Sequence, residues 1–206
     1  MSCTEPHVLI RVAMAIVGLS SVTSCTLLAP VQIETKKEML SQLPSELPQR
    51  TTHPATLLIL PPETNPIFAT TQMAYRIRPY QIDYFTQHEW GAPPAQMLLP
   101  LLVKTLENTR YFSEVFTPPY PSSYTYALRT EIGELTQDFT TGSAAVHLSL
   151  RVQLIDGNTS RVIATKEIAL REPMQEKTPY AGVVAANNAT AKALQAVAIF
   201  VLEKAE

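Results

Sequence analysis

Few side chains in this sequence have the spacing that catalysis needs. The pair His88-Glu89 has no second histidine four residues further on, which a zinc-binding helix would require. His147 falls on the polar side of an alternating segment, which predicts a solvated strand histidine. Glu131 and Glu134 form no recognisable acid pair, and the sequence has neither a Gly-x-Ser-x-Gly turn nor a Gly-rich phosphate loop. The sequence therefore predicts no enzyme, no metal site and no cofactor.

Cys25 has a more specific chemical context. The chain has 2 cysteines, Cys3 and Cys25, and Cys25 ends the segment "VTSC". Before it, Arg11 is followed by an uncharged apolar run over residues 12–22 that is too short to span a bilayer. The segment resembles the lipobox of bacterial lipoproteins, in which small residues let a peptidase cut before a cysteine that is then acylated. The alternative is a buried N-terminal helix in which Cys25 is packed.

The lipobox interpretation divides the chain into three parts. Residues 1–24 are expected to be a signal peptide, residues 25–54 a lipidated N-terminus with a proline-rich tether, and residues 55–206 the folded domain. Several acyl chains on Cys25 would anchor the protein stably in a membrane. Thr26 follows Cys25 where an Asp would signal retention in the inner membrane, so we expect the periplasmic face of the outer membrane.

The composition sets further limits. The chain has 206 residues and a formal charge of -2, so nothing predicts binding to nucleic acid. It has 17 prolines and 6 glycines, which favours stiff connections. The segment from Ala29 to Pro54 is polar and is expected to be a spacer, with a possible short helix around Glu34–Leu43.

The first half of the domain predicts strands followed by a helix. Thr56 to Leu60 is a short apolar run typical of a buried strand. Met73 to Phe85 is rich in aromatic and β-branched residues and predicts one or two strands broken at Pro79. A helix is expected to start at Pro93-Pro94 and to be kinked or restarted by Pro100, with apolar residues at positions 97, 98, 101, 102, 103 and 106.

The second half shows clearer periodicity. Residues 146–154 alternate between apolar and polar side chains, which predicts a half-buried antiparallel strand. Asp156-Gly157 is expected to turn the chain into a partner strand that ends near Leu170. Thr178 is expected to cap a helix that runs to about Lys204. These elements predict an α+β domain of two layers, a mostly antiparallel sheet with two main helices packed on one face.

Aromatic residues form the most unusual feature of the domain. One group comprises Tyr75, Tyr80, Tyr84, Phe85 and Trp90, and a second lies in a proline-rich loop that carries Tyr120 and Tyr124. These rings either fill the junction between sheet and helix or form a surface for a partner or a lipid chain. As candidates for that surface we take Tyr75, Tyr84, Trp90, Tyr120 and Tyr124.

The segment "MAYRIRPYQIDYFTQHEWGAPPAQMLLPLLVKTLENTRYF", together with the lipobox and the alanine-rich C-terminal helix, resembles the ABC-type transport auxiliary lipoprotein family. The matching residues are Ala74, Tyr75 and Arg76 in a strand, Tyr84 after it, and Trp90, Pro93, Pro94, Met97, Leu98, Leu102 and Leu106 around the start of a helix. The resemblance extends over about Thr56 to Glu203.

The resemblance implies a non-enzymatic accessory component of an MCE-type transport system. Its partners would be a periplasmic MCE-family protein with its ABC permease and ATPase, which move phospholipid or other apolar cargo between membranes. An alternative is a structural or assembly lipoprotein of the outer membrane that binds a barrel protein or the cell wall. A homo-oligomer is also possible, because the strand around residues 55–60 and the Tyr75 region could leave sheet edges free.

Overall fold

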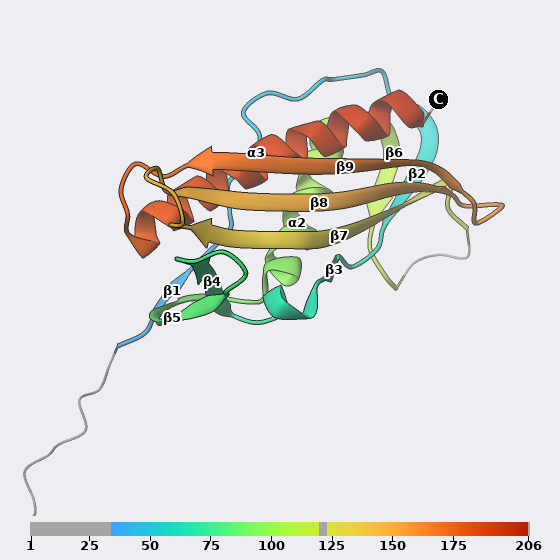
Figure 1. The fold of residues 1–206 in the computed structure, drawn as a ribbon. Helices are drawn as coiled ribbons and strands as arrows, with labels where there is room; N and C mark the ends of the chain where they lie inside the picture. Colours follow the sequence, from blue (N-terminus) through green and yellow to red (C-terminus); the bar gives the residue numbers. More distant parts are fainter. Residues whose placement is uncertain (1–33, 120–122, 206) are drawn as a thin grey trace, which may run out of the picture. The chain divides into compact units, whose positions relative to one another are not determined.

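A long antiparallel meander forms the centre of the fold. The computed structural model describes residues 34–119 and 123–205, and in these residues nine strands form one sheet. Strand β7 (Tyr126–Asp138) pairs along its whole length with β8 (Ala145–Asp156), and β8 pairs with β9 (Val162–Pro173) (Figure 1). The alternation predicted for residues 146–154 is confirmed, since every second side chain from Val146 to Leu154 is buried.

The other edge of β7 is shared by three short strands. They pair with it in parallel, one after another along its length: β2 (His53–Ile59), β3 (Glu63–Thr64) and β4 (Gln72–Arg76). Further out, β6 pairs with β2, β5 with β4, and β1 with β5. These outer strands are β6 (Phe112–Phe116), β5 (Asp83–Trp90) and β1 (Lys36–Glu38). The sheet is therefore mixed, although its longest ladders are antiparallel as predicted.

A bulge at Gly133 changes which side chains of β7 face the core. The pairing with β8 shifts register between Ile132 and Glu134. Leu128 and Ile132 are buried before the bulge, whereas Leu135 and Gln137 are buried after it. One inserted residue is what moves the alternation from even to odd positions. A Cβ at position 133 would lie 2.8 Å from the hydroxyl of Ser149, so a larger residue there would force the Ser149 side chain to move.

Two helices share one hydrophobic core with the sheet, which confirms the predicted α+β class. Helix α2 (Pro94–Asn108) packs against β2, β3 and β6, and α3 (Pro179–Lys204) lies along β8 and β9. A single 3-10 turn, η2 (Pro66–Phe68), precedes β4. Helix α2 is continuous through Pro100, so the expected restart at that residue is wrong.

Side chains form hydrogen bonds with backbone groups at both ends of α3. At its start the hydroxyl of Thr178 accepts a hydrogen bond from the amide of Ala181 at 3.2 Å, which confirms the predicted cap. At its end the hydroxyls of Tyr111 and Tyr126 both donate to the carbonyl of Ala205. Neither helix of the described residues is long and apolar enough to cross a membrane.

The segment before β2 lies against the domain. Residues Thr35–Glu206 form one compact unit, although residues 25–54 were expected to be a tether. The carboxamide of Asn187 on α3 accepts from the amides of Ser41 and Gln42 and donates to the carbonyl of Met39. Residues 36–38 form a strand and residues 39–43 are not helical, so the possible helix around Glu34–Leu43 is wrong.

The turn between β8 and β9 is longer than a two-residue turn at Asp156-Gly157. The carboxylate of Asp156 accepts hydrogen bonds from the amides of Asn158 and Thr159, and Ser160 has a φ of 56°. The Asp156 amide in turn donates to the carbonyl of Arg161. Gly157 is needed because a Cβ there would overlap the carbonyl of Tyr124.

Gly182→Ala should destabilise the protein by about 1–3 kcal/mol, because the new methyl group overpacks the interface between α3 and β7. A Cβ at Gly182 would overlap the buried carboxamide of Gln137, which donates a hydrogen bond to the carbonyl of Pro179. The free energy of unfolding from denaturant titration measures the effect.

Gly142→Ala is the matched control, since a Cβ at Gly142 has no heavy atom within 4 Å. It should change stability by less than about 0.5 kcal/mol. In a Gln137→Ala background the cost of Gly182→Ala should shrink. An equal cost in both backgrounds would contradict the proposed overlap.

Candidate functional site

The aromatic residues of β4 and β5 contact one another and the loop after β7. The ring of Tyr75 stacks on Phe85 with centroids 4.4 Å apart, and Phe139 lies edge-on to both rings. Tyr84 donates its hydroxyl to the carbonyl of Ile67 at 3.0 Å. These contacts fix β5 to β4 and to η2, so both tyrosines have a structural role in the described domain.

The five aromatic candidates do not form one surface. Trp90 is 4% exposed and belongs to the core between sheet and helices, so its ring offers nothing to a partner. Tyr124 precedes the first residue of β7, whereas Tyr75 pairs with Gln137 near its end. At about 3.3 Å per residue, these positions are roughly 36 Å apart. Tyr120 lies outside the described residues.

Arg76 joins β4 to the end of β7. Its guanidinium contacts the carboxylate of Asp138 at 2.9 Å and that of Glu134 at 3.0 Å. Burial alone would raise the pKa of Asp138, but hydrogen bonds from Thr140 and the charge of Arg76 hold that pKa below its usual value. His147 also faces Asp138, at 3.4 Å. We call this cluster of Arg76, Glu134, Asp138 and His147 the clasp, because it links β4 to the end of β7 and to β8.

Of the titratable residues singled out from the sequence, Glu134 and His147 both belong to the Arg76–Asp138 cluster, whereas Glu131 and His88 lie apart from it. Glu131 is opposite Arg151 on β8, four residues beyond His147, or roughly 13 Å along the strand. His88 lies on β5 and contacts Glu38 at 3.5 Å. Within residues 34–119 and 123–205, no group of three His, Cys, Asp or Glu side chains could hold a metal ion.

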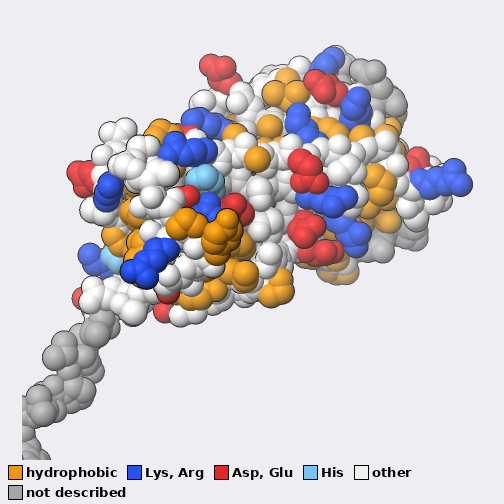
Figure 2. Space-filling model, in the orientation of Figure 1, with side chains coloured by type: hydrophobic (Ala, Val, Ile, Leu, Met, Phe, Trp, Pro, Cys, Tyr) orange, Lys and Arg blue, Asp and Glu red, His pale blue; other side chains and the backbone are white. Residues whose placement is uncertain are grey.

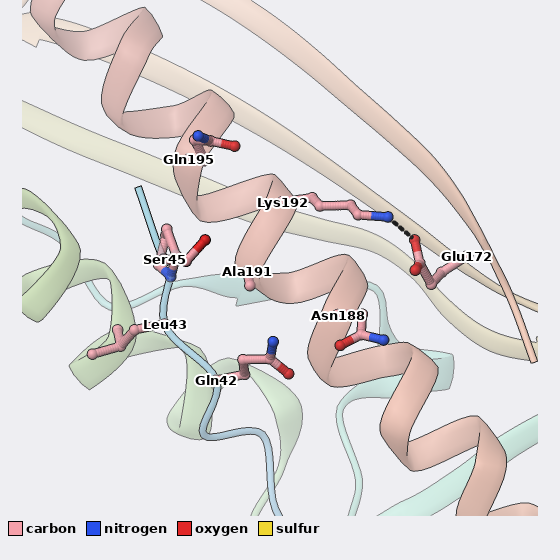
Figure 3. Close-up of a pocket in the computed structure, with 9 residues that line it drawn as sticks. Gln42, Leu43, Ser45, Glu172, Asn188, Ala191, Lys192 and Gln195 are labelled. Atoms are coloured by element: carbon pink, nitrogen blue, oxygen red, sulfur yellow. Dashed lines mark hydrogen bonds and ion pairs between the residues drawn. The ribbon is translucent and has the colours of Figure 1, made fainter. Parts of the chain in front are cut away.

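A polar pocket of about 320 Å³ lies where the segment before β2 crosses α3. Figure 3 shows Lys192 of α3 extending to Glu172 of β9, a contact of 2.6 Å. Gln195, on the same helix, donates to the carbonyl of Glu46 at 3.1 Å. These polar groups connect the segment before β2 and strand β9 to α3. We therefore interpret the pocket as part of the packing between these elements and not as a binding site.

An apolar groove of about 560 Å³ lies between α2 and β6 and is the better candidate for binding. Leu99, Pro100 and Val103 of α2 form one wall, and Val115 and Phe116 of β6 form the other. Lys104 and Glu107 mark its rim with a contact of 3.8 Å. The volume is within the usual range for ligand pockets, and the lining is mostly apolar. We call this feature the α2–β6 groove.

The groove runs beside a free strand edge. In the described sheet β6 pairs with β2 alone, so its outer backbone groups are available to an added strand. The expectation that the strand at residues 55–60 or the Tyr75 region leaves an edge free is wrong. Strand β2 lies between β6 and β7, and β4 lies between β5 and β7. The edge strands of the described sheet are β1, β3, β6 and β9.

Sequence reasoning missed the α2–β6 groove because it grouped Val103 with the other helically spaced apolar residues of α2 and did not consider Leu99. The side chains of Leu98, Leu101, Leu102 and Leu106 are buried, but Leu99 and Val103 lie on a different side of the helix. Apolar residues four positions apart outside the buried stripe are the signal that could have revealed it.

The comparisons with known proteins place this geometry in a family. A sequence model described as the ABC-type transport auxiliary lipoprotein component matches residues 39–198. The chain belongs to this family. The match begins just before Leu40 and includes both walls of the α2–β6 groove, so the groove is part of the family's domain. A comparison with curated proteins finds none that matches.

Solved structures share the fold at low sequence identity. Protein XCC0632 from Xanthomonas campestris, of family DUF330, superposes with a TM-score of 0.70 at 17% identity, covering 82% of this chain and 95% of that one. The hypothetical protein CT253 from Chlamydia trachomatis gives a TM-score of 0.50 at 9% identity, with coverage of 74% and 98%. These likenesses support the fold of this auxiliary lipoprotein family member.

Asp138→Asn should destabilise the protein at neutral pH, with a loss that shrinks in acid. Because the pKa of folded Asp138 is lowered, its stabilisation is complete above the unfolded value of about 3.9 and disappears as the pH falls through the folded value. Denaturant titrations of both proteins at pH 7, 4 and 3 measure the difference.

Thr140 and Arg76 remain in the variant, so the pH dependence isolates the carboxylate. A stability difference that stays constant from pH 7 to pH 3 would mean that Asp138 is not held charged by the clasp.

Proposed function

We propose that this family member is a membrane-anchored, non-enzymatic accessory component of an MCE-type ABC transport system. It would dock a periplasmic MCE-family protein, and its system would move phospholipid or other apolar cargo between membranes. Family membership over residues 39–198 supports the accessory role, and the α2–β6 groove beside a free strand edge is the observation that carries the docking.

The groove suits an extended apolar segment of a partner. A strand added to the edge of β6 would form backbone hydrogen bonds, and its alternate side chains, on the face that α2 covers, would reach the apolar lining of the groove. The Lys104–Glu107 pair at the rim adds polar contacts around an apolar centre, an arrangement common in protein interfaces.

Anchoring through Cys25 fits the length of chain before the domain. Nine residues separate Cys25 from Thr35, where the compact unit begins. Acylation of Cys25 would hold the domain near the bilayer, and Thr26 at the next position favours the outer membrane. The protein would then present its groove to a partner that comes from the inner membrane.

A non-enzymatic role agrees with how the polar side chains are used. Asp138 and Glu134 bind Arg76, Glu172 binds Lys192, and Glu167 binds Arg151. These pairs stabilise the described domain and leave the α2–β6 groove lined mainly by carbon. Such a groove offers mainly apolar contacts to a partner.

Val103→Glu should reduce capture of the MCE-family protein at least tenfold, because it places a charge against the apolar wall of the groove. The full-length lipoprotein is purified from membranes in detergent, and co-purifying proteins are quantified by mass spectrometry. A tenfold loss corresponds to about 1.4 kcal/mol of binding free energy.

Val162→Glu is the matched control, since Val162 is 49% exposed at the start of β9, away from the groove. It should leave the capture unchanged. Equal losses for the two variants would contradict docking at the groove. A barrel protein or cell-wall fragments in place of an MCE-family protein would instead favour a structural or assembly lipoprotein.

A further inference from the structure

The connection between β4 and β5 exposes large apolar side chains. We define residues 77–81 as the hairpin tip. In it Ile77 is 52% exposed and Tyr80 is completely exposed, at 107% of the reference area. An isolated exposed apolar residue needs no explanation, but two in one short connection form a small exposed apolar patch.

The backbone of the tip is strained at its aromatic residue. Tyr80 has a φ of 65°, in the left-handed region that favours glycine and costs a bulky residue roughly 1–2 kcal/mol. Pro79 precedes it and the tip closes with a hydrogen bond from the Gln81 amide to the Arg78 carbonyl. An exposed tyrosine at a position where glycine would relieve strain points to a contact made by its side chain.

The tip lies at the end of the domain from which the chain arrives. Strand β4 runs parallel to β7, and Arg76 pairs with Asp138, the last residue of β7, so the tip extends beyond that end. Strand β1 runs parallel to β5, with Lys36 beside His88. The chain that leads into β1 therefore comes from the side of Asp83, where the tip joins β5.

Cys25 is close enough for the tip to reach the membrane. The chain from Cys25 to Thr35 spans at most about 35 Å, because Thr35 lies ten positions after Cys25. Lys36, at the start of β1, pairs with His88. From there β5 extends back roughly 17 Å to Asp83, so the tip lies on the side of the domain where Cys25 is attached. Figure 2 shows hydrophobic side chains and Lys or Arg side by side on the lobe where the described chain begins.

We propose that the hairpin tip inserts Ile77 and Tyr80 into the headgroup layer of the bilayer that holds the lipid anchor. The proposal rests on the anchoring of Cys25 under the proposed function and adds a second, non-covalent contact with the same membrane. Tyrosine suits this layer because its ring is apolar and its hydroxyl stays in contact with water.

The contact depends on apolar insertion and not on charge. Within residues 77–83 the one basic residue, Arg78, is matched by one acidic residue, Asp83. No net attraction to anionic lipid results from equal numbers of opposite charges. Binding of the tip should therefore be nearly independent of the anionic fraction of the membrane.

Insertion of the tip would set the distance between the α2–β6 groove and the membrane surface. Phe116 on β6 pairs with Leu58 on β2, and Leu58 pairs with Ala127 on β7. Ala127 lies 11 residues before Asp138, so this end of the groove is roughly 36 Å from the tip end of the sheet. With the tip in the bilayer, the groove would stand off the membrane and face a periplasmic partner.

The test places an environment-sensitive NBD fluorophore on the full-length lipidated protein in phosphatidylcholine vesicles. On the proposed processing Cys3 is removed and Cys25 is acylated, so Gln81→Cys provides one reactive thiol beside the tip. Asn158→Cys, in the turn at the opposite end of β7, is the control position. Flotation measures anchoring, and quenching by brominated lipids measures insertion.

We expect blue-shifted emission and lipid quenching at position 81, none at position 158, and little change when phosphatidylglycerol is added. Ile77→Ser with Tyr80→Ser should abolish the quenching, whereas Val162→Ser should not. Protein that floats without quenching at position 81 would overturn the tip contact and leave the anchoring intact. Protein that does not float would overturn both. Loss of quenching on adding a purified MCE-family protein would assign the tip to that partner and overturn the lipid contact.

Discussion

Strand β7 is the constraint on which the rest of the domain depends. Its 13 residues pair with β8 along one edge and with β2, β3 and β4 in succession along the other. Every remaining strand is attached through β8, β2 or β4, whereas β3 has no further neighbour in the described sheet. The Gly133 bulge keeps both halves of β7 facing the helices. Because three separate chain segments must find their places on one edge, most of the contacts that define the fold are non-local.

The residues that resemble the family pattern mainly hold this sheet together. Ala74 is buried, Tyr75 stacks on Phe85, and Arg76 closes the clasp with Asp138. Trp90 and the buried face of α2 fill the core. The surfaces proposed for function lie elsewhere, on the second face of α2, on the free edge of β6 and at the hairpin tip. Family membership thus identifies the fold, whereas the proposed docking and membrane contacts depend on side chains at the surface of that fold.

The sequence predicts those elements whose signals are local. The alternation of residues 146–154 and the cap at Thr178 are sufficient to place β8 and α3. Strands β1 and β3 could not be predicted, because they are three and two residues long and are formed only by pairing with distant strands. How the two aromatic groups lie in space depends on the same distant pairing, since the topology of β7 separates Tyr75 from Tyr124. The α2–β6 groove requires knowledge of where β6 lies.

Photo-crosslinking from the rim of the groove tests the central claim most directly. A photoreactive amino acid in place of Lys104, 58% exposed beside the groove, is compared with one in place of Glu167, 68% exposed on β9. In cells with the complete transport system, position 104 should form an adduct with an MCE-family protein, and position 167 should not. A barrel protein crosslinked at position 104, or the same adducts from both positions, would contradict docking through the groove.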